Sequence, residues 1–369
     1  MERGKARSGL RHTGASAKST LPITTRFNLK SDIVRGGRSF CHSADNNLYL
    51  TLVKGLLNTH MAEQSSAIGY HNLALGDKPN YQHINVEPLT LALGALVSGV
   101  SLSRACSDEV YAEIADALWQ YHVLFFHGQA LTAESHLSLA KHFGDPEVHE
   151  IFQADKDYPE ISILLNDKKR PPEVNSWHTD TTFREKPSLC TILYCEVMPE
   201  AGGDTMWLNQ NVAFEALSQP IREMLLGLEA EHDILNYYSG TEMLEGAGGE
   251  EKGLELRKSH PIVRHPVVVA HPITGIPCLL VNPTHTKRLV DMRKLESERL
   301  LQFLYEHTQT PEFTVRFRWK PGSIAIWDNF ATQHYALADY YPMHRKMRRI
   351  TVEGRKTVAY DPARFSQNT

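Results

Sequence analysis

The sequence lacks long apolar runs and is poor in cysteine. Its longest apolar stretch, 89–102, is interrupted by Gly94, Ser98 and Gly99 and is too short to span a bilayer, so we expect no membrane partner. The cysteines form no CxxC pair, and their odd number leaves one unmatched in any disulfide scheme. We therefore expect reduced thiols in a cytoplasmic protein. The five are Cys41, Cys106, Cys190, Cys195 and Cys278.

A strong charge of either sign is also missing. The formal net charge is −4, with 22% charged and 41% hydrophobic residues among 369, which is ordinary for a globular protein. This balance gives no electrostatic reason to expect nucleic acid as a partner. The oligomeric state stays open, with a homo-oligomer as one alternative.

Acidic residues are almost absent from the first 40 positions. Nine Lys or Arg residues stand there against only Glu2 and Asp32. Such a segment is typical of a transit peptide, of a disordered tail, or of sequence upstream of a true start at Met61. We favour the last two together, and no apolar segment that would indicate a secretory signal follows. Residues 1–80 are therefore predicted to be a disordered or non-native extension, and 81–369 a single folded domain.

Many short strand patterns and a few helical ones follow. Helices are predicted over 107–122, 133–143, 212–227 and 295–307. Strands are predicted over 123–126, 161–165, around 178, 189–196, 205–208, near 267 and 279, 313–319 and 323–327. This order predicts a mainly β fold, an antiparallel two-sheet roll with helices packed outside. The Gly- and Glu-rich segment 239–253 lacks periodicity and is interpreted as a lid or a mobile surface loop.

The pair His178 and Asp180 is the first candidate metal site. On a strand, residues two apart point to the same face. With a distant His334, they would form the two-His, one-carboxylate triad that binds non-haem Fe(II) and leaves metal positions open. Among 19 histidines, roughly one His-x-Asp is expected by chance, so the tripeptide needs support from its context.

That context is supplied by Arg345 and Thr205. A planar guanidinium can hold the distal carboxylate of a dicarboxylate such as 2-oxoglutarate through two hydrogen bonds, and a threonine hydroxyl can donate to the same group. Two alternatives remain at this level. The three ligands could hold Zn(II) in a hydrolase, or a non-enzymatic roll could bind a small anion through Arg345 and Arg349.

Several longer blocks, in order, resemble one enzyme family. They are HFGDPEVHEIF, NSWHTDTTF, AGGDTMWLNQNVAFEALS, HPITGIPCLLVN, FRWKPGSIAIWDNFATQHYALADY and HRKMRRITVEG. Across about residues 82–356 the chain is similar to the taurine dioxygenase family of Fe(II)- and 2-oxoglutarate-dependent oxygenases, which includes 2,4-dichlorophenoxyacetate and alkylsulfate dioxygenases. The resemblance implies a double-stranded β-helix, or jelly roll.

The resemblance also implies roles for individual residues. The iron ligands would be His178, Asp180 and His334. The 2-oxoglutarate carboxylate would be held by Thr205 and Arg345. The substrate sulfonate of the taurine enzyme is bound by a histidine and an arginine at the positions of His149 and Arg349.

Three pocket positions depart from the taurine enzyme. Phe152, Val174 and Tyr237 stand where that enzyme has Tyr, Asn and Ser. These changes keep an anion site but remove partners for an ammonium group, and an unpaired ammonium in such a pocket is penalised. We therefore expect a small anionic organic substrate with an apolar body: an alkyl or aryl sulfonate, a sulfate ester, or an aryloxyalkanoate.

The reaction implied by the resemblance is hydroxylation of the carbon next to the substrate heteroatom. O2 and 2-oxoglutarate would be consumed, and succinate and CO2 released. The hydroxylated product would then collapse to sulfite, sulfate or a phenol together with a carbonyl compound.

Overall fold

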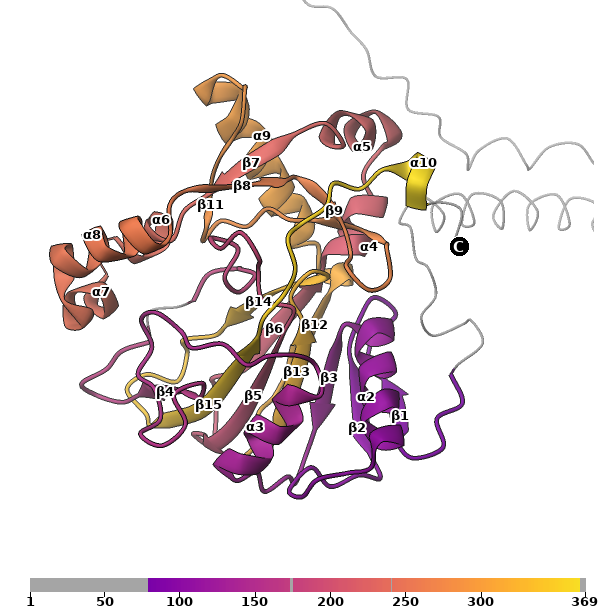
Figure 1. The fold of residues 1–369 in the computed structure, drawn as a ribbon, viewed down its shortest axis with the longest axis vertical. Coiled ribbons are helices and arrows are strands. Elements are labelled where there is room, and N and C mark those ends of the chain that lie inside the picture. The colour runs from indigo at the N-terminus through magenta and orange to yellow at the C-terminus, as the bar shows by residue number, and fades with distance from the viewer. Residues whose placement is uncertain (1–78, 173–174, 240, 366–369) are drawn as a thin grey trace, which may run out of the picture. The chain divides into compact units, whose positions relative to one another are not determined.

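The fold described here is that of a computed structural model, which describes residues 79–172, 175–239 and 241–365 (Figure 1). All of these residues belong to one compact unit. The expected extension over 1–80 falls almost entirely outside the described residues, as does Val174, so both expectations stay predictions.

A seven-stranded sheet forms the larger layer. Its strand order is β1-β2-β3-β13-β5-β15-β4, antiparallel except between β2 and β3. The strands are β1 (Asn85–Pro88), β2 (Ala95–Ser98), β3 (Val123–Phe126), β13 (Ile324–Asp328), β5 (Cys190–Val197), β15 (Arg345–Val352) and β4 (Ser162–Asn166).

A second, three-stranded sheet of order β12-β6-β14 packs against the first. It consists of β12 (Thr314–Phe317), β6 (Thr205–Asn209) and β14 (Thr332–Ala336), all antiparallel. The space between the sheets is filled by large side chains from both, including Trp207, Phe317, Phe125, Trp327 and Met347. The predicted two-sheet roll, a jelly roll with flanking helices, is therefore confirmed.

Two helices cover the outer face of the large sheet. They are α2 (Asp108–Tyr121) and α3 (Ala133–Lys141), which lie beside β3, β5 and β13 in Figure 1. Ile114 and Leu118 of α2 and Leu139 of α3 share a buried cluster with residues of these strands. Because both faces of β3 and β13 are covered, these strands are apolar throughout instead of alternating.

The remaining elements form two smaller sheets and the helices around them. One sheet has the order β11-β7-β8, and β9 pairs with β10. Their bounds are β7 (Glu229–His232), β8 (Val263–Pro266), β9 (Val268–Ala270), β10 (Pro277–Leu279) and β11 (Thr286–Leu289). The described chain also contains the helices α6 (Leu235–Tyr238), α9 (Lys294–Thr308) and α10 (Pro362–Phe365) and a 3-10 turn η1 (Pro311–Phe313).

Two expectations about helices are wrong. The predicted helix over 212–227 is two helices, α4 (Gln210–Glu215) and α5 (Gln219–Leu225), because Pro220 suits only the first turn of a new helix. The predicted loop over 239–253 is mostly helical, with α7 (Glu242–Ala247) and α8 (Gly249–Ser259). Leu244 and Leu256 of these helices are buried.

Within the described ranges, none of the helices has the length and apolar character needed to cross a bilayer.

Candidate metal centre and active-site cavity

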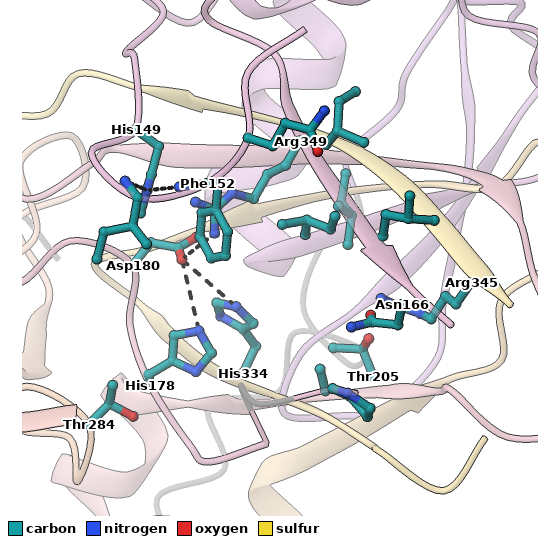
Figure 2. A pocket seen from close by; sticks show the side chains of 18 of the residues that line it. His149, Phe152, Asn166, His178, Asp180, Thr205, Thr284, His334, Arg345 and Arg349 are labelled. Atoms are coloured by element: carbon teal, nitrogen blue, oxygen red, sulfur yellow. Dashed lines mark hydrogen bonds and ion pairs between the residues drawn. The ribbon is translucent and has the colours of Figure 1, made fainter. Parts of the chain in front are cut away.

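A cavity of about 370 Å³ extends from the space between the two sheets to α6 and the chain after β4. Eight of the ten residues that the sequence singled out line it (Figure 2): His149, Phe152, His178, Asp180, Thr205, His334, Arg345 and Arg349. They come from loops before β4 and β5 and from β6, β14 and β15.

The predicted metal ligands converge in this cavity. One ligand atom from each of His178, Asp180 and His334 lies within 4.8 Å of the others. Asp180 Oδ1 is 3.9 Å from His178 Nε2 and 4.0 Å from His334 Nε2. All three side chains are buried.

The expected strand carrying His178 and Asp180 is wrong. His178 forms a single β-bridge with His334, closed by two backbone hydrogen bonds, and Asp180 already lies in a turn. Thr181 has a φ of +54°, and its Oγ1 accepts a hydrogen bond from the Ser188 backbone N–H. The chain therefore turns immediately after the first ligand, and this turn brings the carboxylate towards both imidazoles.

Hydrogen bonds set the orientation of the ligands. His178 Nδ1 donates to the Ser176 carbonyl at 2.8 Å, which leaves Nε2 free for a metal. Asp180 Oδ2 accepts from Thr191 Oγ1 at 2.7 Å, and Oδ1 accepts from Arg349 Nη1 at 3.2 Å. The His334 ring packs against Trp327 at 4.7 Å between centroids.

The protonation states suit a divalent metal. Burial lowers the pKa of both His178 and His334, so the imidazoles are neutral. Burial alone would raise the pKa of Asp180, but the Arg349 guanidinium beside it and the hydrogen bond from Thr191 hold it below its usual range. Two neutral imidazoles and a carboxylate are the donor set that a metal requires. These residues therefore fit a metal ion that keeps open positions.

Arg345 occupies the end of the cavity near β4. Its side chain is buried, and no carboxylate in the described chain pairs with it. Its guanidinium lies 5.6 Å from the ring centroid of Tyr340, and Nε has no hydrogen-bond partner among the described residues. Burial lowers the pKa of Arg345, yet the group stays cationic. A buried guanidinium that has no carboxylate partner in the described chain fits the carboxylate of an added molecule.

Thr205 faces the same end of the cavity (Figure 2). Its Oγ1 accepts a hydrogen bond from Trp319 Nε1 at 2.9 Å, so the Thr205 hydroxyl proton is available to donate to a different group. Sequence reasoning missed Asn166 and Tyr340 here. The Tyr340 hydroxyl donates to Asn166 Oδ1 at 2.7 Å, and both side chains line the cavity. An isolated Asn or Tyr carries no motif that would have identified either.

Arg349 is the second buried arginine of the cavity. It stands on β15, as does Arg345, and its Nε and Nη2 atoms have no partner in the described part of the chain. Its guanidinium lies 4.6 Å from the centroid of the Phe152 ring, which in turn is 4.3 Å from the His149 ring. His149 Nδ1 accepts from the backbone N–H groups of Ile151 and Phe152, so the imidazole proton is on Nε2.

Tyr237 is placed differently from the other predicted pocket residues. The cavity lining in the described chain includes the following residue, Tyr238, together with Thr284 and His285, and it does not include Tyr237. Sequence reasoning missed these three residues. Tyr238 ends the four-residue helix α6, and so short an element has no periodicity that could reveal which face is inward.

The comparison with known families decides the identity. A profile described as taurine catabolism dioxygenase TauD, TfdA family, matches residues 85–351. The chain belongs to the TauD/TfdA family of dioxygenases. An alkylsulfatase from Acinetobacter baylyi is 36% identical over 282 residues, covering 75% of this chain and 87% of that protein. An alpha-ketoglutarate-dependent sulfate ester dioxygenase from Pseudomonas putida is 35% identical over 296 residues, covering 79% and 96%.

Solved structures agree with this assignment to the TauD/TfdA family. A taurine dioxygenase from Burkholderia xenovorans superposes with a TM-score of 0.64 at 34% identity, covering 75% of this chain and 93% of that one. A structure described as AAD-2 in complex with Mn(II) and N-oxalylglycine gives a TM-score of 0.62 at 26% identity, covering 74% and 99%. The expectation of a jelly-roll, 2-oxoglutarate-dependent dioxygenase is confirmed, and the zinc hydrolase and the non-enzymatic roll are set aside.

Proposed function

We propose that this enzyme uses Fe(II), 2-oxoglutarate and O2 to hydroxylate the carbon next to the heteroatom of a small sulfo-anion. The substrate is a sulfate ester or an alkyl or aryl sulfonate. Products are sulfate or sulfite and a carbonyl compound, with succinate and CO2. The names of the relatives, an alkylsulfatase and a sulfate ester dioxygenase, support this substrate class.

One observation carries the proposal: Arg345 and Arg349 are two buried cations in the same cavity. They lie four positions apart on β15, so both point to the same face of the strand about 13 Å apart, at 3.3 Å per residue. Figure 2 places the metal-binding cluster nearer to Arg349 than to Arg345. A cavity with two separated cations fits two anions, a keto-acid co-substrate and an anionic substrate.

In this proposal His178, Asp180 and His334 hold Fe(II), which supplies the activation of O2 by oxidation of 2-oxoglutarate. Arg345 and Thr205 bind the distal carboxylate of 2-oxoglutarate and so fix its orientation towards the metal. His149, which burial keeps neutral, donates from Nε2 to the substrate anion beside Arg349. Thus the chain positions one C–H bond at the metal.

The apolar walls of the cavity have a separate task. Leu193, Phe183 and Trp327 line it and are buried, and they exclude water from the region between the two anion sites. Water exclusion strengthens the hydrogen bonds to both anions and protects the reactive centre. Phe152, which packs against Arg349, gives this end of the cavity an apolar surface and offers no partner for an ammonium group.

An aryloxyalkanoate is the second candidate substrate. The aromatic face of Phe152 beside Arg349 could stack on a phenoxy ring, since aromatic pairs favour such contacts. An (S)-phenoxypropionate dioxygenase from Sphingobium herbicidovorans is 29% identical over 287 residues. The carboxylate of an aryloxyalkanoate substrate would then occupy the Arg349 site.

A cytoplasmic location remains a prediction, and the oligomeric state stays open. The free state of Cys106, Cys190, Cys195 and Cys278 supports a reducing compartment.

A substrate panel tests the proposal. Succinate release is measured with taurine, alkylsulfonates, alkyl sulfates and phenoxyalkanoates. We expect the fastest turnover with an apolar sulfo-anion, whereas much faster turnover of taurine would contradict the proposal. In parallel, anaerobic Fe(II) and 2-oxoglutarate should give a visible charge-transfer band that His178→Ala abolishes. Absence of the band in the unmodified protein would argue against the assigned cofactor.

A further inference from the structure

Tyr238 lines the cavity, and its buried cluster packs against Ile151, whose backbone N–H donates to His149 Nδ1. The side chain is buried and lines the cavity, and its hydroxyl makes no hydrogen bond within the described part of the chain. Burial raises the pKa of this hydroxyl, so it stays protonated. The hydroxyl is therefore a protonated donor near the proposed anion site, with no partner of its own there.

Surrounding groups hold Tyr238 in place. Phe183, Ile234, Leu244 and Leu256 pack around it in one buried cluster. On the other side its ring centroid is 6.4 Å from that of His285. A side chain with a fixed ring has a hydroxyl of fixed position, so it can bind an oxygen without losing further rotational freedom.

The anion site has one cationic side chain, and one of its nitrogen atoms, Arg349 Nη1, is already paired with Asp180 Oδ1. His149 and His285 are neutral because burial lowers the pKa of both, to about 3 for His285. The cation is Arg349, whose Nε and Nη2 have no partner among the described residues. One cation with several neutral donors fits a monoanion that spreads its charge over several oxygen atoms.

We propose that Tyr238 is the third donor of this anion site and that it selects a tetrahedral sulfo head over a planar carboxylate. Arg349 and His149 satisfy two oxygens, which is all that a carboxylate presents. A sulfate ester or a sulfonate has a third terminal oxygen, and Tyr238 donates to it. This inference rests on the proposed function, and it makes a single residue responsible for selecting the sulfo head group.

Binding of two matched ligands tests the role of Tyr238. Hexane-1-sulfonate and heptanoate carry the same six-carbon chain on different heads. Dissociation constants are measured by calorimetry under nitrogen with Fe(II) and 2-oxoglutarate bound. A hydrogen bond to a charged group is worth about tenfold or more in affinity. Tyr238→Phe should therefore raise the dissociation constant of hexane-1-sulfonate by about tenfold and change that of heptanoate by less than about twofold.

Controls separate this role from a structural one. Tyr305→Phe removes a hydroxyl from a partly buried tyrosine on α9, outside the cavity lining, and should change neither constant. In Tyr238→Phe the KM for 2-oxoglutarate should also stay constant, because Arg345 and Thr205 are untouched. Equal weakening of both ligands, or of neither, would overturn the inference. Failure of the unmodified enzyme to bind or oxidise any sulfo-anion would overturn the proposed function itself, and the two failures are thus distinguishable.

Discussion

His178 and His334 are joined by their backbones as well as by their position in the metal cluster. The His178 N–H donates to the His334 carbonyl at 3.0 Å, and the His334 N–H donates back at 2.8 Å. Their rings are 4.1 Å apart between centroids. The distance between two ligands distant in sequence is therefore set by main-chain hydrogen bonds, and side-chain packing only adjusts it.

The hydroxyl of Thr191 should affect metal affinity without touching the metal. It donates to Asp180 Oδ2, and it also accepts from Asn329 Nδ2 at 2.9 Å. Thr191→Val keeps the shape and removes the donor, so the carboxylate loses its orientation. We expect metal affinity to fall by about tenfold, as is usual when the partner of a metal ligand is removed. Metal titration monitored by the charge-transfer band measures this.

A distant threonine provides the control. Thr308 is buried at the end of α9, and its hydroxyl donates to the Tyr305 carbonyl. Thr308→Val should lower stability but leave metal affinity unchanged. If both variants lower the affinity for the metal equally, the effect comes from global destabilisation and not from the lost orientation of Asp180.

The two cavity arginines on β15, Arg345 and Arg349, should have separable kinetic effects. Arg345→Met should raise the KM for 2-oxoglutarate by about 30-fold or more, because loss of a buried charged partner typically costs at least 2 kcal/mol. Arg349→Met should raise the KM for the substrate and also weaken the metal, since Arg349 contacts Asp180. Steady-state kinetics with each substrate varied in turn shows the difference.

Arg348 is the matched control on the opposite face of the strand. It pairs with Glu196 at 2.8 Å, donates to the Leu131 carbonyl and lies over the Tyr194 ring. Arg348→Met should therefore lower stability but change neither KM. A change in the KM for 2-oxoglutarate in this variant would contradict the division of roles along β15.

Buried histidines should make the protein sensitive to acid. His136 on α3 donates from Nε2 to the Ile192 carbonyl, and its Nδ1 has no partner in the described chain. Burial lowers its pKa to about 3, with a smaller effect of Arg348. In the unfolded chain the value is about 6.5, so between these values the unfolded state binds more protons. The stabilisation due to neutral His136 is complete above pH 6.5 and is lost as the pH falls.

His136→Leu should therefore flatten the dependence of stability on pH. Below pH 6.5 each such histidine costs up to about 1.4 kcal/mol per pH unit, so the variant's slope should be smaller by that amount. Urea unfolding between pH 4.5 and 7.5 measures it. Leu139→Ala, on the same helix, removes a buried side chain that does not titrate and should lower stability without changing the slope. Parallel curves for His136→Leu and the unmodified protein would contradict the prediction.

Helices α7 and α8 should affect the substrate end of the cavity alone. Leu256 on α8 is 1% exposed and packs in the cluster that surrounds Tyr238, whereas Leu254 on the same helix is 60% exposed. Leu256→Ala should destabilise this cluster by about 2–4 kcal/mol and raise the substrate KM. Leu254→Ala is the control and should do neither. Hydrogen exchange over 242–259 measures the local loss of stability, and steady-state kinetics measures the substrate KM. A raised KM for 2-oxoglutarate in Leu256→Ala would argue against a local effect.

Hydrophobic patterns predicted eight of the fifteen described strands, but they missed β14 and β15, which carry His334 and the two cavity arginines. The apolar run 123–126 and the segment 323–327 correspond to β3 and β13, shifted by one residue in the second case. These strands are buried on both faces, so their sequences are apolar throughout and can be recognised without the structure. Helix α9 was likewise predicted to within one residue at each end, because its apolar face repeats over several turns.

The local path of the chain at the site could not be predicted. The pair His178 and Asp180 suits a strand by spacing, but the hydrogen bonds between Thr181 and Ser188 stabilise a turn. Those bonds depend on a residue seven positions away, which no short pattern reveals. The helices at 242–259 were missed for a related reason. Few of their residues are buried, so the apolar stripe is weak, although Thr241 caps the first by accepting from the Leu244 N–H.

The placement of both arginines on β15 has a consequence for how such enzymes diversify. The strand fixes the spacing of the two anion sites, so a change of spacing would need an insertion inside a central strand. The walls of the substrate end come from separate, irregular segments: the loop carrying His149 and Phe152, helix α6, and the turn at Thr284. Mutation can remodel these segments while the co-substrate end is inherited intact, so new substrates are accessible by exchanging loops on an unchanged strand.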